Sequence, residues 1–284
     1  MKFLLVLALM TSMSTDLLAE TPNPKYFAND KVQRLAPLAF ALQIEASAFH
    51  KASKEISIKE RQALVHLINS NPELKNNILG FKDLDWTKKE EVLREVFLKE
   101  VQSLNIKAPI LIIDSKTIKG QAYFDFDINN PTPGTVILNP EELAKDSNAL
   151  APLLLLIHET RHSAQFQMAF LNGDSHNPIA ASYKAAFIAQ KEHAKEIVSF
   201  CDFLTLVNEY EAFQFGNYVV SSLFNGNADT LGMGTYAGQY HPDMTLKIDL
   251  EEIFKRYESG ENKRSILSIF NDLERAQYEI LTKQ

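Results

Sequence analysis

The stretch LLLLIHETRH, residues 153–162, carries the strongest structural signal in this chain of 284 residues. Its first half is an unbroken apolar run, and its second half has the form His-Glu-x-x-His. Residues four apart lie on the same face of an α-helix, so the side chains of His158 and His162 can reach one ion. An apolar helix that buried these polar groups without partners would be strongly destabilised. We therefore expect a buried helix that binds a metal ion.

Zinc is the metal that this pattern favours. Catalytic zinc sites keep three protein ligands and one open position for water, and His158 and His162 would supply two of these ligands. Glu159 would lie beside the water, where a carboxylate can accept its proton. The pattern therefore predicts one zinc ion and a hydrolytic reaction with Glu159 as the general base.

The third ligand has two candidates, Glu209 and Glu211, in the sequence NEYEAFQFG at residues 208–216. On a helix, the face of Glu209 carries small side chains, whereas the face of Glu211 carries larger ones. Small side chains would let this segment approach the His-Glu-x-x-His helix closely. They are Thr205, Ala212 and Gly216. We favour Glu209 as the ligand and keep Glu211 as the alternative.

The remaining sequence predicts an α+β fold that is mostly helical. From residue 30 to residue 105, apolar residues recur at spacings of three and four, which indicates a helical N-terminal half. Ser57-x-x-Glu60 and Thr87-x-x-Glu90 have the form of capping boxes that begin helices. Short runs of β-branched and aromatic residues then predict a small three-stranded sheet close to the motif helix. These runs are at residues 110–113, 121–127 and 135–138.

The first 19 residues have the features of a secretory signal peptide. Lys2 precedes a short apolar run at residues 3–10, and Ala19 is a small residue suited to cleavage. The apolar run is shorter than the roughly 20 residues that a membrane span requires. We expect an exported protein, periplasmic or secreted, with no stable membrane anchor after cleavage. The mature chain would consist of a helical N-terminal region, 20–107, and a region with the site, 108–284.

Composition limits the classes of partner. The net charge is -7, and an acidic chain does not favour nucleic acid or anionic membranes as partners. Cys201 is the only cysteine, so the fold depends on its apolar core without an intramolecular disulfide. The expected partner is a peptide or protein substrate.

The combination of motifs resembles the gluzincin metallopeptidases. The resemblance rests on HETRHSAQ at 158–165 and EYEA at 209–212, and it covers residues 135–216. The chain is similar to bacterial metallopeptidases of unassigned substrate. The resemblance implies a zincin-like fold, with Glu209 as the third zinc ligand. It also implies that an edge strand above the metal, at residues 134–139, binds extended substrate.

One position departs from the pattern of some relatives. Where they carry an Asp that orients a ligand imidazole, this chain has Phe213. A ligand imidazole normally donates its second N–H to a carboxylate or a carbonyl. This chain must therefore supply the acceptor elsewhere, for example from a backbone carbonyl.

The sequence leaves the oxyanion donor and the class of function open. Metal-assisted hydrolysis needs a donor to the developing oxyanion besides the metal. The candidates are Tyr218, Tyr236, Tyr240 and His241. Besides a zinc metallopeptidase, two other functions fit the motifs: a zinc-stabilised binding protein without turnover, and a zinc amidase that acts on a cell-wall component.

Overall fold

The computed structural model describes most of the chain after its N-terminal segment. The described residues are 27–172, 176–228, 240–241, 243–246, 248–260 and 264–282, and side chains are described up to residue 276. The expected signal peptide at 1–19 and the oxyanion candidate Tyr236 lie outside these residues. Within the described ranges, no helix combines the length and the apolarity that crossing a membrane would need.

The structure is mostly helical with one small sheet, which confirms the predicted α+β class. The helices before the sheet are α2 (Asp30–Gln33), α3 (Ser47–Asn69), α4 (Pro72–Leu79) and α5 (Trp86–Leu104), with 3-10 turns η2 (Pro37–Ala39), η3 (Ile44–Ala46) and η4 (Phe81–Asp83). Those after the sheet are α6 (Pro140–Leu143), α7 (Ala151–Phe170), α8 (Pro178–Glu192), α9 (Phe200–Leu204), α10 (Val207–Leu223), α11 (Leu250–Glu258) and α12 (Ile266–Thr282).

Both predicted capping boxes are wrong as helix starts. The carboxylate of Asp85 accepts the backbone N–H of Lys88 at 2.9 Å, so Asp85, and not Thr87, caps α5. Ser57 lies in the middle of α3. Its hydroxyl donates to the carboxylate of Glu211 on α10 at 2.6 Å. The side chain thus forms a tertiary contact instead of a cap.

The sheet has the strand order β1-β3-β2. Strand β1 (Ile110–Ile113) pairs parallel with β3 (Thr135–Leu138), and β2 (Ala122–Asp125) pairs with β3 antiparallel. The three predicted strands are therefore present. The expectation of an edge strand at 134–139 is wrong, because β1 occupies the other side of β3 and makes it the central strand. The edge strand beside the predicted site is β2.

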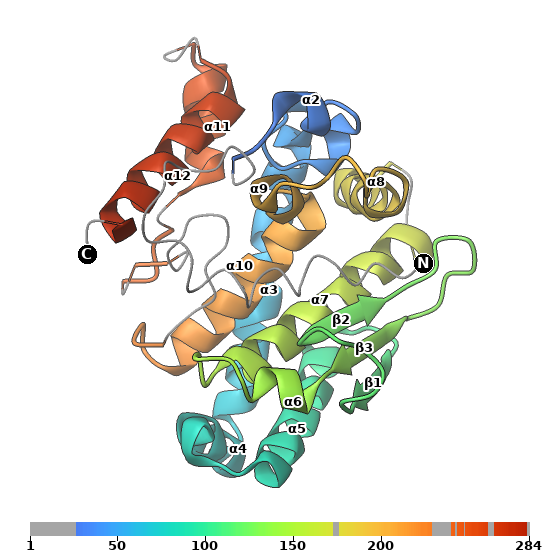
Figure 1. The fold of residues 1–284 in the computed structure, drawn as a ribbon, viewed down its shortest axis with the longest axis vertical. Coiled ribbons are helices and arrows are strands. Elements are labelled where there is room, and N and C mark those ends of the chain that lie inside the picture. Colours follow the sequence, from blue (N-terminus) through green and yellow to red (C-terminus); the bar gives the residue numbers. More distant parts are fainter. Residues whose placement is uncertain are drawn as a thin grey trace.

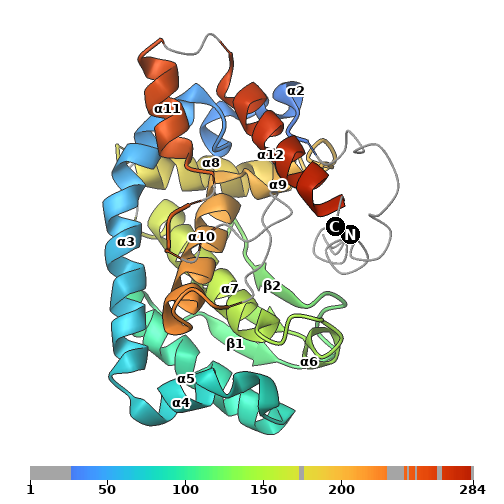
Figure 2. The same cartoon turned by 90° about the vertical axis from the view of Figure 1, so that its left-hand side faces the viewer.

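Helix α7 lies at the centre of the fold. Every residue from 151 to 167 is buried, as expected for a helix that is apolar around most of its circumference. Helices α5, α8 and α10 and the sheet all pack on it, and Figure 1 shows α7 between the sheet and α10. Figure 2 shows α3 along one side of the molecule, where it packs on α5 and α10. Helices from both predicted regions thus contribute to one apolar core.

Helices α10 and α7 approach each other closely at Gly216. A Cβ atom at Gly216 would lie 3.3 Å from the carbonyl oxygen of Leu154, which is tighter than most contacts of this kind. Ala212, one turn earlier on α10, is fully buried. Thr205 precedes α10, and its hydroxyl donates to the carbonyl oxygen of Cys201. The small side chains of α10 itself therefore permit the close approach that the sequence predicted.

Candidate metal centre

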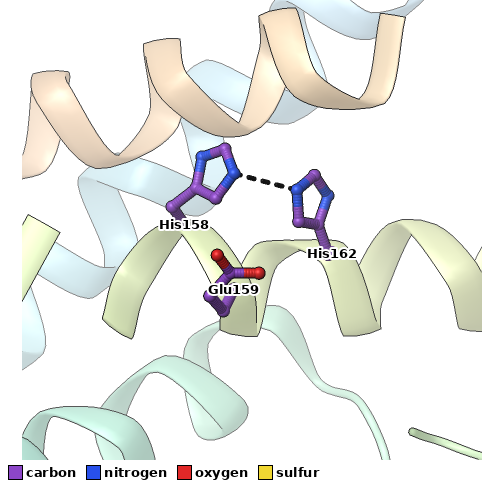
Figure 3. Close-up of side chains that lie close together, drawn as sticks. All are labelled: His158, Glu159 and His162. Atoms are coloured by element: carbon purple, nitrogen blue, oxygen red, sulfur yellow. Dashed lines mark hydrogen bonds between the residues drawn. The ribbon is translucent and has the colours of Figure 1, made fainter. Parts of the chain in front are cut away.

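His158 and His162 face each other across one turn of α7. Their Nε2 atoms are 2.9 Å apart, and the two rings meet almost edge to face. Figure 3 shows both imidazoles on the same side of the helix, with Glu159 below them. Both histidines are at least 96% buried. The predicted convergence of the two imidazoles is confirmed.

Glu209 on α10 completes a triangle with the two imidazoles. Its Oε2 atom lies 3.2 Å from Nε2 of His158 and 3.3 Å from Nε2 of His162. Ligand atoms around a tetrahedral zinc ion at 2.0–2.1 Å would be about 3.3 Å apart. The three atoms therefore stand at almost the separation that a shared zinc ion requires. The chemistry of this donor set, two imidazoles and a carboxylate, also suits zinc.

Glu159 is the other carboxylate near the imidazole pair. It groups with His158 and His162, with ligand atoms within 4.8 Å of one another. Since Oε2 of Glu209 is closer to both nitrogens, Glu209 has the geometry of the third ligand. Glu159 remains beside the triangle, where the sequence predicted the general base.

Glu211 points away from the imidazoles and into a buried hydrogen-bond network. Its Oε2 accepts from Nε of Arg161 at 2.8 Å and from the amide of Gln165 at 2.7 Å. Its Oε1 accepts from Ser57. Both carboxylate oxygens are thus engaged, and the alternative of Glu211 as the metal ligand finds no geometric support.

Gln165 orients the imidazole of His162. The Gln165 amide donates to Glu211, an acceptor, so its carbonyl oxygen faces Nδ1 of His162 at 2.8 Å. When the ring is neutral, as metal binding requires, Nδ1 carries its proton, and Nε2, which is directed at the triangle, is the free ligand atom. Gln165 was not among the residues predicted from the sequence. Gln165 could have been predicted from its position three residues after His162, which places both side chains on the same face of the helix.

His158 lacks such an acceptor. Its Nδ1 atom is buried and has no hydrogen-bond partner among the described residues. The ring of Phe213 lies against the imidazole instead, with centroids 4.1 Å apart. For His158, the described part of the chain therefore offers no replacement for the missing Asp, such as the expected backbone carbonyl. The orientation of this ring depends on packing against Phe213.

Gln190 on α8 orients the carboxylate of Glu209. Its amide donates to Oε1 of Glu209 at 2.6 Å, and its carbonyl oxygen accepts from the side chain of Asn208 at 3.2 Å. Oε1 is thus occupied, so Oε2 is the atom that reaches the imidazoles. Gln190 lies outside both motifs, and no sequence spacing pointed to it.

The charges within the triangle depend on one another. Burial lowers the pKa of His158 to about 4, and the imidazole of His162 adds to this effect. Burial also disfavours the charged form of His162, but the carboxylate of Glu209 outweighs it and raises the pKa of His162 to about 9. Although burial opposes it, His162 holds the pKa of Glu209 well below its usual range. A metal ion bound by these atoms would compete with the protons that they bind.

Glu159 has one oxygen without a partner. Burial raises the pKa of its carboxyl group to about 8, although the imidazole of His162 and the nearby backbone N–H of Phe124 on β2 oppose the rise. Its Oε1 atom is buried and accepts no hydrogen bond from the described part of the chain. A buried carboxylate oxygen of this kind is satisfied by water or by a ligand. The arrangement thus fits a metal site with a water at its open position.

A cavity of about 410 Å³ opens onto the triangle. Its walls include the two imidazoles, both site carboxylates and Tyr123 of β2. Burial raises the pKa of Tyr123 to about 12, helped by the nearby carboxylates of Asp125, Glu159 and Glu209. Tyr123 is therefore a protonated hydroxyl, and a hydrogen-bond donor, in the wall of the site.

The three predicted oxyanion donors that the structure describes, Tyr218, Tyr240 and His241, do not line this cavity. The guanidinium of Arg61 lies 4.3 Å from the centre of the Tyr218 ring and donates to the hydroxyl of Tyr240 at 3.0 Å. His241 also lies outside the cavity walls. Among the described residues, Tyr123 is the tyrosine that lines the cavity. The alternating pattern of its strand could have pointed to it in the sequence.

A buried ion network connects the motif helix with the N-terminal half. Arg161, inside the His-Glu-x-x-His motif, pairs with Glu211 on α10 at 2.8 Å and with Glu60 on α3 at 2.6 Å. Its guanidinium also lies 4.7 Å from the centre of the Phe215 ring. Because an unpaired buried charge is strongly destabilising, these partners fix α7 relative to α3 and α10.

Comparisons with known proteins give no relative. No protein-family model matches the chain, and no curated protein and no solved structure matches it.

The contact between Gln165 and His162 predicts an effect on metal affinity. Replacing Gln165 with Leu removes the acceptor for Nδ1 of His162, so the zinc affinity should fall about 10- to 100-fold. Competition with a chromophoric chelator measures this change. Gln167→Leu is the control, since Gln167 is a buried glutamine of the same helix that bonds to Lys107 and not to a ligand. Equal losses in both variants would contradict the assigned role.

Proposed function

We propose that this protein is a gluzincin-type zinc metallopeptidase in which His158, His162 and Glu209 bind one zinc ion. The observation that carries the proposal is the triangle of ligand atoms, with edges of 2.9–3.3 Å. The free oxygen of Glu159 and the cavity above it add support. A zincin-like fold agrees with the small sheet packed against the motif helix.

Glu159 is the general base in this proposal. A bound zinc ion would lower the pKa of a water molecule to about 7 and polarise the scissile carbonyl group. Burial raises the pKa of Glu159 to about 8, and a neighbouring zinc ion would favour its ionised form. The ionised carboxylate accepts a proton from the attacking water at its unpartnered oxygen and then donates it to the leaving amine.

Tyr123 is the proposed donor to the developing oxyanion. Its hydroxyl belongs to the same cavity wall as Glu159 and the imidazoles. A protonated phenol placed there can donate to the carbonyl oxygen as its negative charge grows. The edge strand β2, which carries Tyr123, also offers backbone groups to an extended peptide. Together these features favour a peptide or protein as the substrate.

A protein without turnover is the second candidate. The observation in its favour is Phe213, which leaves Nδ1 of His158 without an acceptor. In this reading the zinc ion stabilises the contact of α7 with α10, and the protein presents a binding surface. In either reading, export remains part of the proposal on the basis of residues 1–19.

Glu159→Gln separates metal binding from hydrolysis. The variant should bind zinc with unchanged stoichiometry, while peptide hydrolysis falls at least about 1000-fold because the base is lost. Elemental analysis and a broad peptide library provide the two measurements. Glu141→Gln, at an exposed position on α6, is the matched control. Wild-type protein that holds zinc but cleaves no peptide would contradict the proposed peptidase activity and favour the protein without turnover.

Tyr123→Phe tests the oxyanion donor. Removal of the hydroxyl should lower kcat about 100-fold with little change in KM, because the hydrogen bond strengthens only as charge develops. Steady-state kinetics on one peptide substrate measures both constants. Tyr218→Phe should leave them unchanged, since Tyr218 packs under Arg61 and away from the cavity. Equal effects of the two substitutions would rule out the assigned role of Tyr123.

A further inference from the structure

Away from the triangle, the cavity is walled by apolar side chains. They come from the end of β2, from α8 and from the segment that leads through α9 to α10. The residues are Phe126, Phe187, Ala194, Ile197, Phe203 and Leu206. An apolar wall next to a polar centre binds the apolar part of a ligand and leaves its polar groups to the few polar residues.

Aromatic contacts connect this wall with the metal ligands. The rings of Phe124 and Phe187 each lie 6.2 Å from the imidazole of His162, measured between centroids. Both also contact the ring of Phe126, at 5.9 and 4.9 Å. The rings of Phe124 and Phe187 thus separate the ring of Phe126 from the imidazole of His162. A substrate of a few residues can span from the triangle to this ring.

Lys191 provides the only ammonium group in the described cavity wall. Its Nζ atom lies 4.2 Å from the centre of the Phe126 ring, so it marks the apolar end of the cavity. The preceding residue, Gln190, binds Glu209. Two successive side chains of helix α8 therefore contact the proposed metal ligand Glu209 and the apolar end of the cavity at Phe126.

The ammonium of Lys191 has no anionic partner in the described structure. Lys191 is half-buried and forms no ion pair with any described carboxylate. Asp125, the other charged residue of the cavity wall away from the triangle, is exposed and also forms no ion pair. A half-buried ammonium without a carboxylate partner can form a charge-assisted hydrogen bond with an anionic group of a ligand.

We infer that Lys191 binds the C-terminal carboxylate of a peptide whose terminal side chain is apolar and packs against the wall around Phe126. The inference rests on the proposed function and names its substrate class: the enzyme removes a short C-terminal fragment. An α-carboxylate adjoins its own side chain, so one residue supplies both the anion and the apolar group. An acidic side chain would supply the anion alone.

Binding to the Glu159→Gln protein tests this inference without turnover. The probes are zinc-loaded Glu159→Gln protein and a fluorescent hexapeptide that ends in Phe, as the free acid and as the amide. The acid should bind at least tenfold more tightly than the amide. Adding Lys191→Met, which keeps an apolar stem and removes the charge, should abolish the difference. Equal affinity of acid and amide for the protein with Lys191 intact would overturn the inference.

Lys184→Met is the matched control for Lys191→Met. Lys184 lies on the same helix and over an aromatic ring, Phe170, at 5.7 Å, but it does not line the cavity. Its substitution should preserve the tenfold preference for the acid. Loss of the preference in both variants would mean that the general charge of α8, and not Lys191, attracts the peptide, and would overturn the inference.

A third peptide distinguishes the two sources of a carboxylate. It is an amide with Glu in place of the terminal Phe, and it should bind as weakly as the Phe amide. Binding as tight as that of the Phe acid would assign Lys191 to acidic side chains and overturn the C-terminal assignment.

Cleavage by wild-type protein separates the inference from the proposed function. Cleavage of acid and amide peptides at equal rates would leave the peptidase proposal intact and overturn the role of Lys191. A preference for the acid in binding, with no cleavage by wild-type protein, would support carboxylate recognition and refute the peptidase.

Discussion

The ion pair between Arg161 and Glu211 is the constraint on which the arrangement of the helices depends. Arg161 is carried into the core by a helix that is buried on every side, so its charge must be balanced there. Glu211 provides this balance at 2.8 Å, and Gly216 allows α10 to come close enough. Glu209 lies two residues before Glu211 on α10 and points to another face. The pair therefore also determines where the carboxylate of Glu209 meets the imidazoles.

The N-terminal helices belong to this arrangement. Ser57 and Glu60 of α3 bond to Glu211 and Arg161, respectively. Glu211 in turn accepts a hydrogen bond from Gln165, which orients the imidazole of His162. The site is thus supported by residues more than 100 positions apart in the sequence.

Local sequence patterns predicted those features that depend on one helix or one strand. The spacing of His158 and His162 placed both imidazoles on one face, and helical phase separated Glu209 from Glu211. Periodicity could not predict which surfaces meet. It therefore failed for the order of the strands, for the tertiary role of Ser57 and for the position of Tyr218, which lies under Arg61. Gln190 could not be found, since only the folded chain brings α8 to Glu209.

The zinc content of two glutamate variants tests the central claim most directly. Wild-type protein should keep one zinc ion per chain after dialysis against a weak chelator. Glu209→Gln should lose it because one corner of the triangle is gone, whereas folded Glu211→Gln should retain it. Elemental analysis of the folded variants decides the matter. Full zinc occupancy in Glu209→Gln would contradict the account.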